Sequence, residues 1–368
     1  MMRAYRYRIY PDREQEGMLH RTFGCCRFLY NRMLAERTEA YRRGEKAGRL
    51  TPAKYKPAYP WLKEVDSLAL ANVQLHLEEA FRRYYDPSAS RFPRFKSKHR
   101  SRKSYTTNLV NGNIRLEGCR LRLPKVGKVR IKIHRPVPGE GKLKSVTVSM
   151  EPSGKYYASL LYDLPGYENQ VSGKCTEEMD ILGIDFAMHG MAVFSDGRQA
   201  QYPMYYRQAR ERLAREQRKL SHCVKGSRNY VKQKHRVAIC HEKVRNQRKD
   251  FHHKLSRALA DRYDAAAVED IDMKAMSRSM HFGGSVMDNG YGAFRDMLRY
   301  KLEEQGKALV IVDRFFPSSK RCSRCGNVRK VLRLDERVYR CPCGNCMDRD
   351  VNAAVNIREE GRRLLQSA

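Results

Sequence analysis

The alternation of apolar and polar residues divides the first half of the chain into a strand, a helical segment and a second group of strands. Residues 3–10 (RAYRYRIY) alternate along their length and end at Pro11, which is typical of one short strand. Apolar residues then recur at helical spacing and predict two helices, at residues 13–45 and about 67–85, within a helical segment at residues 13–90. Residues 91–165 return to short alternating runs such as RLRL and KVRIKI. We therefore expect a small β-barrel whose first strand, residues 1–12, is separated from the rest by a helical module.

The second half of the chain follows a different pattern. A polar stretch at residues 166–178 is interpreted as a linker. Beyond it, apolar runs predict a strand hairpin and two further strands, at residues 181–197, 264–270 and 308–316. A helix with one apolar face is predicted at residues 291–304. Strands that alternate with helices indicate an α/β sheet covered by helices, which we assign to residues 179–368.

A basic helical hairpin is predicted inside this α/β domain at residues 205–257. Residues 207–254 contain sixteen Lys or Arg and four acids, in two helices that are separated near Gly226. Apolar residues at seven-residue steps, such as Leu213 and Leu220, are typical of a coiled coil. A coiled coil exposed to solvent would explain the seam, but its charges are almost all positive, which favours contact with nucleic acid.

The net charge of the chain makes a polyanionic partner the central expectation. The 368 residues include 74 Lys or Arg and 41 Asp or Glu, a formal charge of +33 that would repel itself away from a polyanion. Residues 91–132 alone contain fourteen Lys or Arg and one acid. A ribosome-associated or histone-like binder without chemistry is the alternative that the charge alone leaves open. Because no apolar run approaches the ~18 residues of a spanning helix, we expect a cytoplasmic protein with no membrane partner.

Three separated acids stand where a divalent-metal site would need them. Asp185 ends an apolar strand run, Glu269 ends another, and Asp350 begins the helical segment DRDVNAAVNI. Each acid alone could be a turn residue or a helix cap. Burying a carboxylate is costly unless it is paired or binds metal. Two divalent ions about 4 Å apart need such a cluster to hydrolyse a phosphodiester. We therefore predict catalytic magnesium or manganese at these three acids.

The cysteines predict a zinc ribbon at residues 317–347. Five of the eleven cysteines lie between Cys322 and Cys346, in two knuckles, CSRCG and CPCGNC, with fifteen residues between Cys325 and Cys341. Two such pairs are a strong indication of tetrahedral zinc. The predicted ligands are Cys322, Cys325, Cys341 and Cys343, with Cys346 as the alternative fourth ligand. Four thiolates leave no position for water, so this zinc is predicted to be structural.

The motifs of this sequence resemble those of the TnpB family of insertion-sequence-encoded proteins. The resemblance is carried by GIDFAMHGMAVFSDG, AVEDIDM, PSSKRCSRCG, CGNCMDRDVNAAVNI and the amino-terminal RAYRYRIYPDREQEGMLHRTFGCCRFLYN. It implies an RNA-guided DNA endonuclease related to the type V CRISPR effectors. The implied architecture is a split wedge β-barrel, a helical recognition module and an RNase-H-like RuvC domain with a zinc-finger insertion.

The resemblance also implies roles for individual residues and partners. Asp185, Glu269 and Asp350 correspond to the catalytic acids, the last as the Asp of a D-x-N-A-A pattern, whereas Asp348 has no counterpart. The C-x-C knuckle departs from the commoner C-x-x-C of the family. A guide RNA from the transposon end and double-stranded target DNA beside a short motif are the implied partners, with a monomer on one RNA. Two alternatives are an RNA-guided DNA-binding regulator that does not cut and a strand-transfer transposase.

Overall fold

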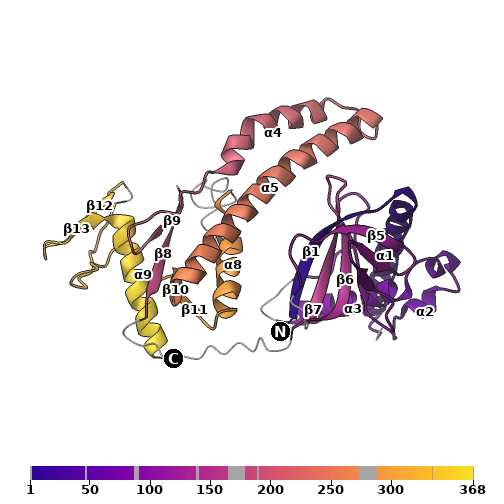
Figure 1. The fold of residues 1–368 in the computed structure, drawn as a ribbon, viewed down its shortest axis with the longest axis horizontal. Helices are drawn as coiled ribbons and strands as arrows, with labels where there is room; N and C mark the ends of the chain where they lie inside the picture. Colours follow the sequence, from indigo (N-terminus) through magenta and orange to yellow (C-terminus); the bar gives the residue numbers. More distant parts are fainter. Residues whose placement is uncertain are drawn as a thin grey trace. The chain divides into compact units, whose positions relative to one another are not determined.

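The chain forms two compact units, Met1–Glu168 and Asn169–Ala368, which are shown in Figure 1 and described separately below. The computed structural model describes residues 2–45, 48–86, 91–137, 141–164, 179–188, 190–272, 288–333 and 335–367. The predicted linker at residues 166–178 lies outside these ranges. No helix in the described part of the chain is long and apolar enough to cross a membrane.

The first unit is built on a seven-stranded antiparallel sheet. Its strands are β1 (Met2–Tyr10), β2 (Lys103–Asn108), β3 (Arg115–Glu117), β4 (Arg120–Leu123), β5 (Gly127–Lys132), β6 (Lys142–Met150) and β7 (Tyr156–Asp163). Their order is β2-β6-β7-β1-β5-β4-β3, so the amino-terminal strand lies between two strands from the far side of the helical segment. This arrangement confirms the interrupted sheet that the sequence predicts. The described strand pairs form a half-barrel, and its closure stays a prediction.

The helical segment of the first unit packs on this sheet. It contains α1 (Arg13–Arg42), the short α2 (Pro52–Tyr55), a 3-10 helix (Pro60–Lys63) and α3 (Ser67–Tyr85). A capping box fixes the start of α1, because Asp12 accepts a hydrogen bond from the amide of Gln15 and the Gln15 side chain accepts one from the amide of Asp12. α1 and α3 contact each other and β2, and they share one apolar core with the sheet. The two long helices predicted from apolar spacing are confirmed.

The second unit contains a four-stranded sheet with helices on both faces. The strands are β8 (Ile181–Ala187), β9 (Met191–Phe194), β10 (Ala265–Glu269) and β11 (Ala308–Val312), in the order β11-β10-β8-β9. β10 runs parallel to β8 and β11, and β9 returns antiparallel to β8. On one face lie α5 (Arg228–Arg262) and α8 (Tyr291–Glu303), and on the other lies α9 (Arg349–Gln366). The predicted α/β architecture is confirmed.

Two glycines allow α9 to lie directly on the sheet. A Cβ atom added to Gly183 of β8 would stand 2.0 Å from the carbonyl oxygen of Ala354 in α9. A Cβ atom added to Gly361 of α9 would stand 2.4 Å from Cβ of Ala267 in β10. No side chain at these two positions separates the helix from the strands. The absence of a side chain at Gly183 therefore sets the height of α9 above the sheet at Ala354 and Arg358, in its second and third turns.

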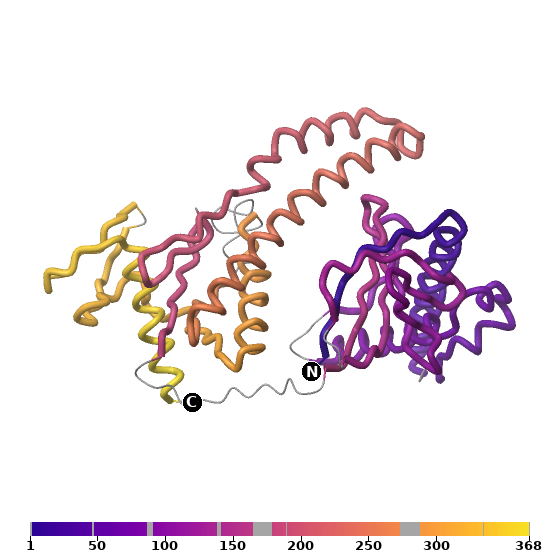
Figure 2. Tube along the Cα trace, viewed as in Figure 1, coloured from indigo at the N-terminus to yellow at the C-terminus, as the bar shows by residue number. Residues whose placement is uncertain are grey.

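A long helical hairpin extends from this α/β core, as Figure 2 shows. It consists of α4 (Tyr205–Ser221) and the first part of α5, which pack against each other. The helices are separated at Gly226, which has a φ of 88°, and α5 begins after Ser227, whose hydroxyl accepts from the amide of Tyr230 at 3.1 Å. Leu213 and Val244 are buried in the hairpin. The predicted pair of helices and the break between them are confirmed.

Candidate functional site

Asp185 lies on the face of the sheet that α9 covers. Side chains alternate between the two faces of a strand. Leu182, Ile184 and Phe186 belong to the core beneath α5 and α8. Gly183 and Asp185 therefore point to the opposite face, and the contact of Gly183 with α9 agrees with this. The Asp185 side chain is partly buried near the end of β8.

Glu269 stands beside Asp185 on the same face. Val268 belongs to the core beneath α5 and α8, whereas Ala267 packs in the core beneath α9, so the next residue, Glu269, also faces α9. In the parallel register Val268 pairs with Ile184, which places Glu269 and Asp185 next to each other at the carboxyl ends of neighbouring strands. This edge is where α/β sheets commonly bind ligands.

Asp350 reaches this edge from the first turn of α9. The helix begins directly after Asp348, whose carboxylate accepts hydrogen bonds from the amides of Asp350 at 2.9 Å and Val351 at 3.0 Å. Asp348 is thus the helix cap, and the side chain of Asp350 does not serve as the cap. Because α9 lies directly on Gly183, its first turn carries Asp350 to the end of β8.

The electrostatics of the three acids indicate a site for a cation. Burial, then the charge of Asp350 and then the charge of Glu269 raise the pKa of Asp185 well above its ordinary value. Burial and Asp270 also raise the pKa of Glu269. The guanidinium of Arg349 opposes the shift at Asp185, but it donates to Asp350 at 3.1 Å. A divalent ion would remove the repulsion that remains, and carboxylate oxygens are the donors that magnesium and manganese prefer.

Four cysteines come together in the ribbon, beside the short hairpin of β12 (Val338–Arg340) and β13 (Cys346–Asp348). The Sγ atoms of Cys322, Cys325, Cys341 and Cys343 all lie within 4.8 Å of one another. Cys322 and Cys343 are 3.6 Å apart, as are Cys325 and Cys341. Tetrahedral zinc with Zn–S bonds of about 2.3 Å places its thiolates about 3.8 Å apart, so the donor set fits zinc. Cys346, the alternative ligand, lies outside this group of four.

Backbone amides prepare one of these thiols for a metal. Burial raises the pKa of Cys322, but hydrogen bonds from the amides of Cys325 and Arg324 outweigh it and lower the pKa to about 6. The lowered pKa favours the thiolate form of Cys322, and thiolate is the form that binds metal. The carboxylates of Asp185, Glu269 and Asp350 are more widely spaced than the four thiols. In the described part of the chain, their oxygens do not all lie within 4.8 Å of one another, as the four sulfur atoms do.

Two buried asparagines of α9 join the ribbon to the acid site, and the apolar pattern alone did not predict their role. Asn352 donates to the carbonyl of Arg321 at 2.8 Å and accepts from the amide of Ser323 at 3.0 Å. Asn356, one turn later, donates to the carbonyls of Ser318 and Arg321 at 2.8 and 2.7 Å. Polar residues four positions apart on the buried side of a helix are the signal that could have indicated this docking.

A second set of contacts that sequence reasoning missed lies just beyond Asp185. Asn289, 1% exposed, donates to the carbonyl of Met188 at 3.1 Å, and the Tyr291 hydroxyl donates to the carbonyl of Ala187 at 2.7 Å. The neighbouring Asp288 accepts from two backbone amides in the first turn of α4, at 3.0 and 3.2 Å. The residues before α8 thus tie the end of β8 to the base of the basic hairpin.

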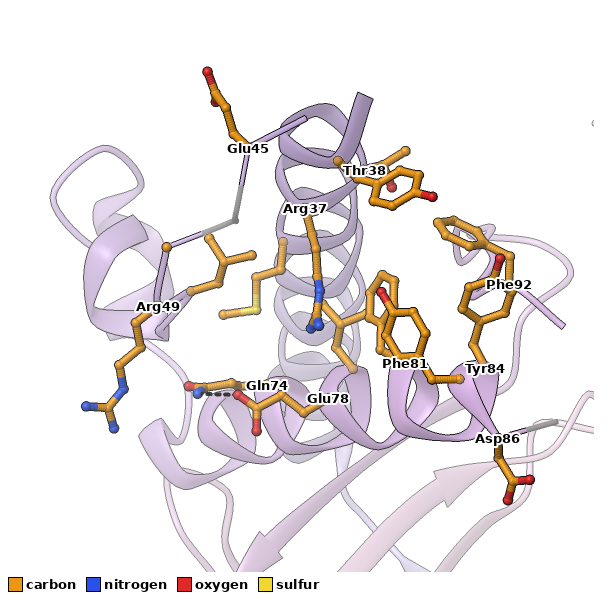
Figure 3. A pocket seen from close by; sticks show the side chains of 16 residues that line it. Arg37, Thr38, Glu45, Arg49, Gln74, Glu78, Phe81, Tyr84, Asp86 and Phe92 are labelled. Carbon is orange, nitrogen blue, oxygen red and sulfur yellow. Dashed lines mark hydrogen bonds between the residues drawn. The ribbon is translucent and has the colours of Figure 1, made fainter. Parts of the chain in front are cut away.

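The first unit contains a cavity of about 890 Å³ between α1 and α3, which Figure 3 shows from close by. Aromatic rings line it, including Phe81, Tyr84 and Phe92, and the guanidinium of Arg37 lies 3.9 Å from the centroid of the Phe81 ring. None of the predicted site residues lines this cavity. This cavity is therefore not part of the predicted acid site.

Comparison with known proteins finds relatives along nearly the whole chain. Family models match three segments: a probable transposase family at residues 166–280, a Cas12f1-like TNB domain at 291–357 and a helix-turn-helix domain at 1–46. A Streptomyces pristinaespiralis protein named as an RNA-guided DNA endonuclease is 35% identical, over 98% of this chain and 89% of that protein. InsQ of Escherichia coli K12, named in the same way, is 30% identical over 99% and 93%.

The fold is similar to that of Cas12f1 in a cryo-EM structure of its complex with sgRNA and target DNA. The TM-score is 0.60 at 13% identity, over 97% of this chain and 98% of that chain. In this chain, residues 2–10 and 13–42 form β1 and one helix, α1, rather than a helix-turn-helix. The identity to relatives over nearly their full length confirms the resemblance seen in the motifs, and the chain belongs to the TnpB family of insertion-sequence-encoded proteins.

Proposed function

We propose that this protein is an RNA-guided DNA endonuclease whose nuclease site consists of Asp185, Glu269 and Asp350. The observation that carries the proposal is the convergence of three acids, from two strand ends and one helix start, in which the charges of Asp350 and Glu269 raise the pKa of Asp185. Carboxylates that oppose one another's ionisation are suited to divalent ions. The names of the relatives support RNA guidance.

The acids would hold magnesium or manganese through their carboxylate oxygens. Bound there, two such ions would activate a water and stabilise the leaving 3′ oxygen of a phosphodiester. The protein's part is to hold the acids on rigid elements: Asp185 and Glu269 on adjacent strands, and Asp350 on a helix that rests on the sheet. Arg349, beside Asp350, adds a cation at the place where the DNA phosphate would arrive.

The rest of the chain would hold the nucleic acids. Guide RNA from the transposon end would lie against the basic surfaces of the first unit and the hairpin, in a complex of one protein with one RNA. The RNA would pair with the target, and the protein would read a short adjacent motif. Zinc at the four clustered cysteines would stabilise the fold of the ribbon. The hydrogen bonds of Asn352 and Asn356 to the ribbon would then hold α9 in a fixed position against it.

Plasmid cleavage by the full-length protein, purified with its RNA, tests the proposal. We expect Asp185→Ala to abolish cutting with manganese or magnesium while retaining RNA. Asp348→Asn is the matched control, because asparagine also caps helices and Asp348 is used as a cap; this variant should cut. Cutting by Asp185→Ala would contradict the assigned site. Guided binding without cutting by the natural chain would indicate a regulator, and end joining without RNA a strand-transfer enzyme.

A further inference from the structure

The turn that follows β11 presents one aromatic ring to solvent at the edge of the sheet that bears the acids. In the parallel register Glu269 pairs with Val312, the last residue of β11. The next residues, from Asp313 onward, therefore leave the sheet at the edge where Glu269 ends. Phe315, three residues beyond Val312, is 85% exposed. An exposed aromatic ring offers a flat face on which an unpaired base can stack.

The residues around Phe315 are anchored, so its exposure is built into the turn. The amide of Phe315 donates to the carboxylate of Asp313 at 2.8 Å, and the amide of Phe316 donates to the carbonyl of Asp313 at 3.0 Å. The Phe316 side chain packs against the core beneath α9. Arg314 donates to Asp270, the residue after Glu269, at 2.7 Å. Asp313, Arg314 and Phe316 thus each contact another part of the protein, which fixes the backbone of the turn, and the Phe315 ring extends from it into solvent.

The chemistry of this turn suits single-stranded nucleic acid. Unpaired bases stack on exposed aromatic rings whatever their sequence, and nearby cations contact the backbone between them. Exposed cations lie along the same segment, at Arg314, Lys320 and Arg324. A protein partner would be expected to meet a wider apolar surface, whereas here the next aromatic residue, Phe316, is turned into the core.

We propose that Phe315 stacks on an unpaired base of the DNA strand that enters the acid site, and so holds the adjacent phosphodiester near Glu269. This inference rests on the proposed function. It assigns to the turn a contact with single-stranded DNA that is independent of base identity. A double helix has no free base faces in its interior, so the contact selects DNA that has already been opened.

Binding and cleavage of single-stranded DNA by the full-length protein with its RNA test this inference separately from the proposed function. The binding probe is an oligonucleotide with 2-aminopurine, whose fluorescence falls when it stacks, in buffer without divalent ions. We expect Phe315→Ala to lose the quenching and to bind about 10-fold more weakly. Phe315→Trp should restore both. Val331→Ala, which removes a ribbon side chain that is 73% exposed, is the matched control and should bind like the natural chain.

The outcomes distinguish the two proposals. Natural quenching and affinity in Phe315→Ala, or a loss that tryptophan does not repair, would overturn the stacking contact even if the protein cuts DNA normally. Quenching that depends on Phe315 in a protein that never cuts would support the contact and contradict the endonuclease. With cutting present, the KM for a pre-opened target should rise about 10-fold in Phe315→Ala, with a smaller change in kcat.

Discussion

A methyl group at Gly183 should move the three proposed catalytic acids apart while leaving the rest of the protein folded. The added Cβ would stand 2.0 Å from the carbonyl oxygen of Ala354 and 2.8 Å from the amide nitrogen of Arg358. Both atoms belong to the backbone of α9, which cannot rotate away. Ordinary contact needs about 3.4 Å or more, so the helix must move by about 1.4 Å.

The displacement should cost far more activity than stability. Overpacking of this kind costs about 1–3 kcal/mol, whereas a misplacement of about 1 Å in a catalytic constellation can cost about 100-fold in rate. We therefore expect Gly183→Ala to cut plasmid DNA at least about 100-fold more slowly, to lose about 1–3 kcal/mol of unfolding free energy in urea, and to retain its RNA.

Gly361→Ala is the matched control for this prediction. Its Cβ would stand 2.4 Å from Cβ of Ala267, also between α9 and the sheet, but eleven residues along the helix from Asp350, or about three turns. It should lower the unfolding free energy by a similar amount and slow cutting much less. Equal cutting rates in Gly183→Ala and the natural chain would refute the idea that this close contact positions Asp350.

Two further predictions concern metals. In divalent-free buffer, the raised pKa of Asp185 means that ionisation of this carboxyl lowers the stability of the folded protein. The loss begins as the pH rises above the ordinary pKa of 3.8 and is complete above the pKa of the folded state. Asp185→Asn should therefore melt at a higher temperature at pH 7, by about 2–4 °C for each kcal/mol of unfolding free energy regained. The difference should vanish near pH 4, and manganese should raise the Tm of the natural chain alone; a natural chain that is the more stable at pH 7 would contradict this. In the ribbon, Cys343→Ser should bind less than one zinc per chain in metal analysis, whereas Cys346→Ser should retain one zinc. The reason is that Cys343, and not Cys346, lies with the other three thiols. The reverse result would identify Cys346 as the ligand.

Local patterns predicted the elements of this fold well. The helices at 13–42 and 67–85, the β8–β9 hairpin and α9 all carry apolar residues at the spacing of their structure. Asp185 and Glu269 could be placed at strand ends for the same reason. The sequence pattern did not settle whether Cys343 or Cys346 is the fourth thiol of the cluster, because this depends on how the backbone of the second knuckle turns in three dimensions.

Contacts between distant segments were beyond the reach of these patterns. Gly183 stands within an apolar strand, and nothing near it in the sequence shows that a helix formed more than 160 residues later will rest on it. Asn289 binds the carbonyls after Asp185, and such backbone acceptors are available in every strand. Composition alone does not reveal which loop will use them.

The central place of β1 in its sheet has a consequence for synthesis. Tyr5 pairs with Leu160 and Ile9 with Ile131, so β1 leaves the ribosome before its partner strands, which are made more than 100 residues later. At about 5–20 residues per second this delay lasts roughly 6–30 s. An unpaired apolar strand is liable to join other chains. The arginines that alternate with its tyrosines add a charge at every second step or so, and they would keep the nascent strand apart from its neighbours until β5 and β7 arrive.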